Sequence, residues 1–281
     1  MRITCVVDNC TGARSNSRSV QKAPGKFISE HGLSMLIENN DGKKVIMDTG
    51  SSEQVFSHNL ATLGVRPKEI DAVFITHGHY DHLGGLPMLL KAGVPCFSHS
   101  KTFKGRRFST AIGQVREIGP STELLALLDE HPPICEDGPK ELVTGISTTG
   151  QVMRTNSYEV PSTFILEHDG VQTPDHILEE QALVISTRKG LIVVTGCGHA
   201  GVVNILSQVR KKSERKLYMV MGGFHLNSVS PDTLLKTMDG LKKLGVEKVV
   251  PMHCTGFQAT KMFSDRFPGF ELFGTGCFID I

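Results

Sequence analysis

Short apolar runs separated by Gly, Asp and Pro dominate the pattern of hydrophobic positions along the chain. Most of the runs are rich in Val and Ile and end at a turn residue, which is typical of buried β-strands. The runs that predict strands are residues 3–7, 34–38, 44–47, 72–76, 181–186, 190–195, 216–221 and 248–251. Between several of them, apolar residues recur at three- and four-residue spacing, which predicts amphipathic helices. These helices are expected at residues 53–63, 85–92, 201–211 and 231–244.

The order of these elements differs between the two halves of the chain. In the first 80 residues the strands mostly follow one another without helices, so antiparallel pairing is expected. After residue 180, strand–helix–strand units predominate. We therefore predict an α/β protein with two sheets inside and helices outside, in one domain over residues 1–281.

The stretch at about residues 97–175 does not follow this pattern. It is rich in Gly, Ser, Thr and Pro, and only one helix is predicted in it, at residues 121–130. Two interpretations stay open. The stretch is an insertion or lid that shapes a substrate pocket, or it is a set of ordinary irregular connections.

Composition limits the classes of function. The chain has 281 residues, of which 39% are apolar and 21% charged, and its formal net charge is +1. These values are ordinary for a soluble protein and give no large basic face, so a nucleic-acid partner is not expected. The longest apolar runs are too short to span a bilayer, so no membrane partner is expected either. The seven cysteines are scattered without a CxxC motif, which argues against a disulfide framework or a thiolate zinc site and favours reduced thiols in a cytoplasm.

Residues 76–85, THGHYDHLGG, place three histidines and one aspartate within six positions at the end of a predicted strand. A loop there can direct His77, His79, Asp81 and His82 to one place, which an extended strand could not. Neutral imidazoles and a carboxylate suit Zn, Fe or Mn. Four ligands on one metal would leave no reaction site, whereas four divided between two metals leave open positions for a bridging hydroxide. We therefore predict one or two divalent ions per chain, Zn first, with Fe and Mn as alternatives.

The His-x-His-x-Asp-His motif, followed by Gly-Gly, lies some 30 residues after a Met-Asp-Thr-Gly segment. This combination resembles the metallo-β-lactamase superfamily. The resemblance implies an αββα four-layer sandwich with a dinuclear site at the sheet edges. It also implies that Asp48, in the Met-Asp-Thr-Gly segment, holds a ligand or the metal-binding loop in place.

The superfamily pattern further implies a His, a bridging acid and a final His from the second half, and here the chain departs from it. The predicted strand 190–195 leads into GCGH, so Cys197 stands where the bridging Asp is expected. The Cys197 thiol could bridge two metals, the second metal site could be weak or empty, or Cys197 could be a buried structural residue. His176 and His199 compete for the third-motif position, and His199 is favoured because it lies on a Gly-flanked turn into a helix. His253 matches the last motif.

Four further segments resemble the branch of the superfamily that includes the dihydropterin synthase of methanopterin biosynthesis. They are EHGLS at 30–34, TGCGHAG at 195–201, GGFHL at 222–226 and PMHCTG at 251–256. The resemblance implies a reaction that joins a dihydropterin methyl diphosphate to an aminobenzene ribofuranosyl phosphate and releases diphosphate. Metal ions would stabilise charge on that leaving group.

Two further histidines and one basic cluster are candidates for contact with the substrate. His225 is expected to serve as general acid, phosphate donor or extra ligand, and His31 is expected beside the substrate; Asp81 is counted with them as catalytic. A hydrogen-bonded structural role is the alternative for both histidines. The segment 101–108 could grip a phosphate, or it could be a solvated charged face. Its basic residues are Lys104, Arg106 and Arg107.

The function expected from these features is a metal-dependent enzyme acting on a phosphorylated small molecule. Two rivals stay open: a metal-dependent hydrolase, such as a phosphodiesterase or cyclic-phosphate esterase, and a non-enzymatic metal- or ligand-binding protein. A homo-oligomer is also compatible with the sequence.

Overall fold

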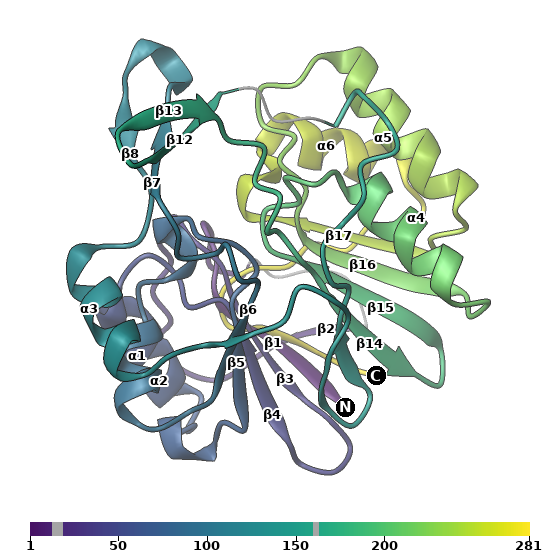
Figure 1. The fold of residues 1–281 in the computed structure, drawn as a ribbon. Coiled ribbons are helices and arrows are strands. Elements are labelled where there is room, and N and C mark those ends of the chain that lie inside the picture. The colour runs from purple at the N-terminus through teal and green to yellow at the C-terminus, as the bar shows by residue number, and fades with distance from the viewer. Residues whose placement is uncertain (13–18, 160–162) are drawn as a thin grey trace.

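Two β-sheets form the centre of the molecule (Figure 1). The computed structural model describes residues 1–12, 19–159 and 163–281. The first sheet has the strand order β2-β18-β1-β3-β4-β5-β6-β9. Its strands are β1 (Arg2–Val7), β2 (Val20–Lys22), β3 (Ser34–Glu38), β4 (Lys44–Met47), β5 (Ala72–Phe74), β6 (Cys96–Ser98), β9 (Ile134–Cys135) and β18 (Cys277–Asp280).

Strand direction changes within this first sheet. The predicted antiparallel pairing is confirmed for β1 with β3 and for β3 with β4. It is wrong for β4 with β5, which run parallel. Helix α1 (Glu53–Thr62) lies between them in the sequence, and a chain that crosses over through a helix returns in the same direction.

The second sheet has the order β10-β11-β14-β15-β16-β17. Its last three strands are parallel because helices connect them, as the strand–helix–strand pattern predicts. Its strands are β10 (Glu141–Val143), β11 (Ile146–Thr148), β14 (Leu183–Thr187), β15 (Gly190–Thr195), β16 (Leu217–Gly223) and β17 (Lys248–Met252).

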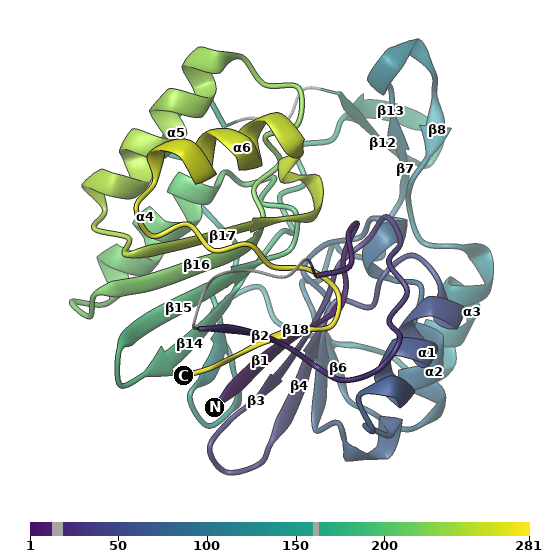
Figure 2. The ribbon, with the colours of Figure 1, turned by 180° about the vertical axis from the view of Figure 1, so that it is seen from behind.

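Helices cover the outer face of each sheet (Figures 1 and 2). Helices α1, α2 and α3 lie on the first sheet, and α4, α5 and α6 lie on the second. The remaining helices are α2 (Leu86–Lys91), α3 (Thr122–Glu130), α4 (Val202–Lys212), α5 (Pro231–Lys243) and α6 (Phe257–Arg266), with short 3₁₀ turns η1 (Pro67–Glu69), η2 (Tyr80–His82), η3 (Ala111–Gly113) and η4 (His253–Thr255). Among the described residues, none of the helices has the length and apolar character to cross a bilayer.

Neighbouring residues of the central strands face different apolar cores. Met47 and Ile192 pack in the core between the sheets, whereas Ile46 and Val193 pack under the helices. Successive strand side chains point to opposite faces, so a strand between two layers must be apolar at every position. This explains the continuous Val and Ile runs. The result is the four-layer αββα sandwich that the motif resemblance implies.

A third, four-stranded sheet projects from this body (Figures 1 and 2). We call it the arm; its order is β13-β12-β7-β8, and its strands are β7 (Arg106–Ser109), β8 (Arg116–Glu117), β12 (Phe164–His168) and β13 (Val171–Pro174). The arm falls within the stretch 97–175 where an insertion or lid is predicted. Other parts of that stretch belong to the body, since α3 packs on α2 and β9, β10 and β11 extend the two central sheets.

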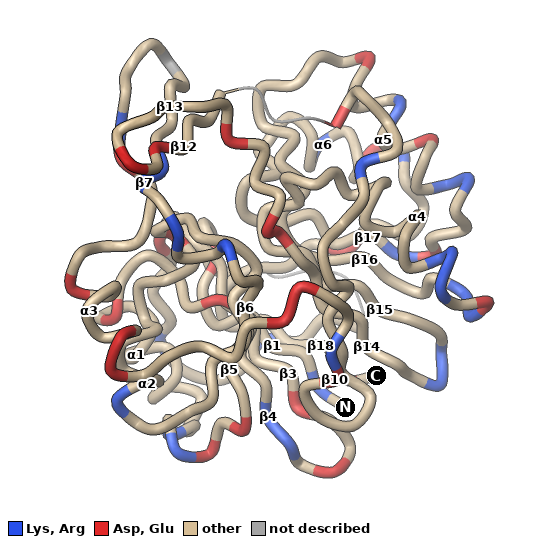
Figure 3. The backbone as a smooth tube through the Cα atoms, in the orientation of Figure 1, with Lys and Arg blue, Asp and Glu red and all other residues tan. Residues whose placement is uncertain are grey.

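Charged residues interleave along the backbone (Figure 3). Basic and acidic residues are both spread over the helices and loops, as expected for 30 basic and 29 acidic residues. The charge distribution along the backbone therefore indicates no single extended region of one sign.

Candidate metal centre

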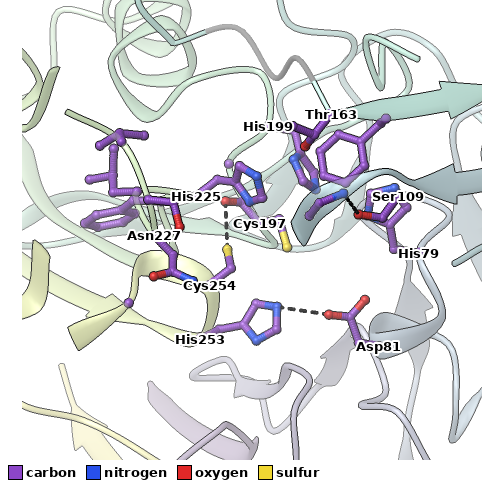
Figure 4. Close-up of a pocket in the computed structure, with 18 of the residues that line it drawn as sticks. His79, Asp81, Ser109, Thr163, Cys197, His199, His225, Asn227, His253 and Cys254 are labelled. Atoms are coloured by element: carbon purple, nitrogen blue, oxygen red, sulfur yellow. Dashed lines mark hydrogen bonds and ion pairs between the residues drawn. The ribbon is translucent and has the colours of Figure 1, made fainter. Parts of the chain in front are cut away.

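The loops that follow β5, β15, β16 and β17 meet at one edge of the two sheets (Figure 4). Parallel neighbouring strands end at the same sheet edge, so side chains just beyond their last residues come together. The loop after β5 carries the HGHYDH motif, and the other three carry His199, His225 and His253 together with two cysteines.

His77, His79 and His199 form the first group. Their ring nitrogens lie within 4.8 Å of one another, and all three side chains are buried. Among the described atoms, Nε2 of His77 and His79 and both ring nitrogens of His199 have no hydrogen-bond partner. Burial holds the pKa of all three imidazoles well below the usual range, so each is neutral, the form that binds a metal.

This donor set fits a divalent metal. A buried polar atom without a partner costs about 1–3 kcal/mol, and a cation shared by the three rings would remove that cost for several atoms at once. Imidazole nitrogens are good donors for Zn²⁺ and its neighbours in the first transition row.

Asp81 is the centre of a second group. Its Oδ2 lies 3.4 Å from Nε2 of His253, 3.1 Å from Nε2 of His31 and 3.9 Å from Nε2 of His82. Burial by itself would raise the pKa of Asp81, but His82, His253 and His31 together hold it well below its usual range. A buried carboxylate among histidines is therefore available as a ligand.

The carboxylate of Asp48 accepts hydrogen bonds from the loop that carries the HGHYDH motif. Its Oδ1 accepts the backbone N–H of Thr76 at 2.8 Å, and its Oδ2 accepts the Thr76 hydroxyl at 2.8 Å. The same Oδ2 accepts Nδ1 of His82 at 2.7 Å, which fixes the ring with Nε2 toward the site. This is the geometry that the resemblance implies for the first acid.

Cys197 takes the place that the superfamily pattern assigns to a bridging acid. Its Sγ lies 3.2 Å from Nε2 of His82, and the ligand atoms of Cys197, His77 and His82 lie within 4.8 Å of one another. The thiol is thus inside the cluster, beside the loop that carries most of the candidate ligands.

The structure separates the two histidines that compete for the third-motif position. His199 lies against the HGHYDH loop, with its ring centroid 4.9 Å from that of His77. The side chain of His176 is exposed, and among the described residues it belongs to none of the candidate metal-binding groups. His199, and not His176, is brought to the centre.

A cavity of about 760 Å³ opens over the centre (Figure 4). Four of the six candidate ligands, His79, Asp81, His199 and His253, line it, and the arm contributes Ser109, Arg116 and Phe164. The Phe164 ring lies 5.2 Å from the rings of His79 and His199 and 5.7 Å from that of His225. The arm therefore limits access to the histidines.

The predicted phosphate-binding cluster is not at this cavity. Arg107 is buried and forms ion pairs with Asp175 at 2.5 Å and Glu179 at 2.9 Å. Arg106 is exposed and pairs with acidic residues of the arm, and Lys104 is exposed and outside the cavity wall. Adjacent residues of a strand point to opposite faces, so Arg106 and Arg107 of β7 could not serve one pocket together.

Sequence patterns did not reveal Tyr80, Arg116 and Phe164 as cavity residues. Arg116 is the only Lys or Arg among the described residues that line the cavity. Its guanidinium donates to the Tyr80 hydroxyl at 2.8 Å and lies 5.0 Å from the centre of the Tyr80 ring. Nothing in the surrounding sequence marks this arginine, because its position depends on the pairing of β7 with β8.

Comparisons with known proteins agree with this fold. Residues 30–104 match the family model of the metallo-β-lactamase superfamily. The chain is 34% identical over 258 residues to the 7,8-dihydropterin-6-methyl-4-(β-D-ribofuranosyl)-aminobenzene-5'-phosphate synthase of Methanocaldococcus jannaschii, covering 86% of each chain. It is also 31% identical over 246 residues to an uncharacterised protein of that archaeon, covering 85% of this chain and 89% of the relative.

A solved structure shows the same arrangement over the whole chain. Tm1679, described as a metal-dependent hydrolase of the β-lactamase superfamily, superposes with a TM-score of 0.83 at 31% identity, covering 100% of this chain and 99% of the other. Zn²⁺-bound PqqB from Methylobacterium extorquens shares the fold, with a TM-score of 0.56 at 12% identity over 100% of both chains. The chain belongs to the metallo-β-lactamase superfamily of enzymes.

Proposed function

We propose that the chain is a metal-dependent transferase that joins a dihydropterin methyl diphosphate to an aminobenzene ribofuranosyl phosphate. The observation that carries this proposal is the 34% identity to the M. jannaschii synthase over 86% of both chains. The cavity supports it, because a volume of about 760 Å³ is within the range of sites for sizeable ligands.

In this proposal the centre holds one or two divalent ions, Zn²⁺ first. His77, His79 and His199 would hold one ion, and Asp81, His82 and His253 would hold the other. Bound there, the ions would supply positive charge to the diphosphate oxygens as the leaving group departs.

Bond changes in the proposed reaction balance without a redox step. The aniline nitrogen forms a bond to the pterin methylene carbon, the bond from that carbon to the diphosphate oxygen breaks, and diphosphate leaves with the electron pair. The aniline N–H proton must also be removed. The aniline proton passes to solvent water, and the chain's role is to align the two substrates and to donate a proton to the departing diphosphate.

His31 is the proposed proton donor to the departing diphosphate. Its Nε2 lies 3.1 Å from Oδ2 of Asp81, and a hydrogen bond to Asp81 raises its pKa above the usual range. His31 lines the cavity and is partly exposed, so its ring can exchange a proton with substrate or water. Asp81 thus has a second proposed role, since it orients and charges His31 as well as serving as a ligand.

Arg116 and Phe164 are the proposed substrate-holding residues of the arm. Arg116 is the one guanidinium among the described cavity residues, and such a group suits a phosphate of either substrate. Phe164 offers a ring face beside the histidines, where a pterin or aminobenzene ring could stack. The His225 ring also lies beside Phe164, with the ring centres 5.7 Å apart.

A hydrolase is the second candidate function. The similarity to Tm1679, whose description is a metal-dependent hydrolase, favours it. In a hydrolase of this centre, water would replace the aniline nitrogen as the attacking group.

Release of diphosphate from a dihydropterin methyl diphosphate by the Zn²⁺-loaded protein separates the two functions. Release that requires the aminobenzene ribofuranosyl phosphate, with formation of the joined product, is expected of the transferase. Release from the diphosphate alone would assign a hydrolase, and absence of release in both reactions would overturn the pterin proposal. His79→Ala should abolish release, whereas His168→Ala, which changes an exposed histidine of the arm, should keep it.

The state of the cysteines supports a proposed location. All seven cysteines are free, and two of them lie in the candidate centre. We therefore propose that the enzyme works in a reducing compartment, the cytoplasm.

A further inference from the structure

Two thiols and an imidazole converge beside the histidine centre. The ligand atoms of Cys197, His225 and Cys254 lie within 4.8 Å of one another. The three residues follow the ends of β15, β16 and β17, which are adjacent parallel strands (Figure 4). The cysteines are 57 positions apart in the chain, so the sequence showed them as scattered residues, and only the sheet brings them together.

A glycine makes the space for the two thiols. Gly223 is the last residue of β16, the strand between the two cysteine-bearing strands. A Cβ atom at Gly223 would lie 2.4 Å from the carbonyl oxygen of Gly196, 2.7 Å from Sγ of Cys254 and 3.1 Å from Cα of Cys197. Any other residue at this position would therefore force the strand end or the Cys254 side chain to move.

The backbone around His225 is held in an unusual conformation. His225 has a φ of 48°, in the left-handed region that non-glycine residues rarely adopt. The loop is fixed on both sides, because the Phe224 N–H donates to the Thr255 hydroxyl at 3.1 Å and Sγ of Cys254 donates to the Cys197 carbonyl at 3.3 Å. These contacts keep the three side chains together.

His225 has an unsatisfied nitrogen in this cluster. Its Nδ1 is buried and has no hydrogen-bond partner among the described residues. One ring nitrogen of His225 lies within 4.8 Å of both sulfur atoms, and imidazole with thiolates is a donor set that binds Zn²⁺ and other borderline or soft cations.

We propose that Cys197, Cys254 and His225 form a thiolate-rich position for one borderline or soft divalent cation, Zn²⁺ by its chemistry, beside the histidine and aspartate groups. Binding there would displace the protons of the two thiols to solvent and form two metal–sulfur bonds. Cys197 is shared, because its sulfur also lies 3.2 Å from Nε2 of His82. The inference rests on the metal-binding part of the proposed function and not on the pterin reaction.

X-ray absorption at the zinc edge of the Zn²⁺-loaded wild-type protein tests this position directly. Zn–S scattering at about 2.3 Å is expected beside Zn–N and Zn–O scattering at about 2.0–2.2 Å. The Co²⁺-substituted protein should show a thiolate-to-cobalt charge-transfer band. Nitrogen and oxygen scattering alone, with no such band, would overturn the proposal, and neither measurement depends on a variant that must fold.

Variants then assign the sulfur ligands. Cys197→Ser and Cys254→Ser should each reduce the Zn–S contribution to about half, and the double substitution should remove it. Cys135→Ser is the matched control, because Cys135 is exposed and distant from the cluster, and it should leave the spectrum unchanged. A Zn–S contribution that survives the double substitution would overturn the assignment.

The outcome is separable from that of the proposed function. Diphosphate release by a protein whose zinc has only nitrogen and oxygen neighbours would contradict the thiolate position and would still support the transferase proposal. A Zn–S signal in a protein that releases no diphosphate would support the thiolate position and contradict the transferase proposal.

Discussion

The carboxylate of Asp48 accepts a hydrogen bond from Nδ1 of His82 at 2.7 Å, and both side chains are completely buried. Burial opposes protonation of His82, but Asp48 and Asp81 outweigh it and raise the pKa of His82 to about 9. Asp48 has a φ of 54°, and its carboxylate also binds Thr76 at the start of the metal-binding loop. One buried acid therefore sets both the position and the charge of a candidate ligand.

This pair predicts how the stability of the metal-free protein depends on pH. The folded-state pKa of His82 is raised above its unfolded value of about 6.5, so the stabilisation is fully present below pH 6.5 and is lost as pH rises through about 9. The free energy of unfolding should lose up to about 3 kcal/mol from this source across that range. Urea unfolding at several pH values measures it.

Asp48→Asn removes the main charge that raises the pKa of His82, so this variant should show a flatter profile between pH 6.5 and 9. Asp280→Asn is the control, because Asp280 is an exposed partner of Arg2 and should leave the slope of the wild type unchanged. An equal slope in Asp48→Asn and wild type would contradict the role given to the pair.

Arg107 is predicted to be a structural residue. Its guanidinium is the cation that pairs with two buried carboxylates, Asp175 and Glu179, and burial raises the pKa of Glu179 to about 7 although Arg107 opposes that shift. Arg107→Met would leave both carboxyl groups buried without that cation, and we expect a loss of about 3–5 kcal/mol in the free energy of unfolding.

The alternative for Arg107 has a different signature. A phosphate-binding arginine, as the basic cluster in the sequence suggested, would raise KM on substitution and leave stability unchanged. Arg106→Met is the control, because Arg106 lies exposed on the same strand and its loss should change stability little. Chemical denaturation of the metal-free proteins decides between the two roles.

Gly78 lies between two candidate ligands, His77 and His79, and has no room for a side chain. A Cβ atom there would lie 2.0 Å from the backbone carbonyl oxygen of Thr102 and 3.1 Å from Nε of Arg107. We expect Gly78→Ala to lower the free energy of unfolding by about 1–3 kcal/mol and to weaken Zn²⁺ binding, because the loop must move. Isothermal titration with Zn²⁺ and urea unfolding measure the two effects.

Gly138→Ala is a matched control for that substitution. A Cβ atom at Gly138 meets no heavy atom within 4 Å, so this change should alter the free energy of unfolding by no more than about 0.5 kcal/mol. A Gly78→Ala protein that binds Zn²⁺ like the wild type would show that the tight packing under the loop does not position the histidines.

The sequence predicts the body of the fold well because its strands lie between two apolar layers. The runs at 34–38, 44–47 and 190–195 coincide with β3, β4 and β15. A strand that is covered on both faces must be apolar throughout, so its composition alone identifies it. The helices that cover the sheets carry the matching three- and four-residue spacing.

The arm could not be predicted in the same way. Its β8 has two residues, and β7 pairs with β12, whose first residue follows 55 positions after the last residue of β7. Its strands are short and partly exposed, so they leave no apolar pattern, and their pairing depends on contacts distant in sequence. For this reason Arg116 and Phe164 were missed as cavity residues.

The candidate ligands were predictable where they cluster in sequence and uncertain where they do not. The HGHYDH motif named four of them in one loop. His199 and His176 both stand near β15, and only the turn after that strand brings His199 within 4.9 Å of the His77 ring. Burial of both ring nitrogens without hydrogen-bond partners then distinguishes His199 from an ordinary surface histidine.

That difference gives a paired test of the third-motif ligand. His199→Ala removes one of the three imidazoles of the first group, so we expect at least one fewer Zn²⁺ ion per chain and loss of diphosphate release. Saturating Zn²⁺ should stabilise the wild type against thermal unfolding, by about 2.7 kcal/mol at 100 times the dissociation constant. The stabilisation should be smaller in His199→Ala, because fewer ligands hold the ion.

His176→Ala is the matched control, since His176 is exposed and its described contact with the body is a hydrogen bond from Arg154 to its backbone carbonyl. A methyl side chain keeps that carbonyl, so zinc content, zinc-dependent stabilisation and diphosphate release should all equal those of the wild type. Elemental analysis of the purified proteins and thermal unfolding with and without Zn²⁺ provide the comparison. Loss of zinc in His176→Ala with full zinc content in His199→Ala would reverse the assignment, because it would require the loop at residues 175–178 to close over the HGHYDH motif.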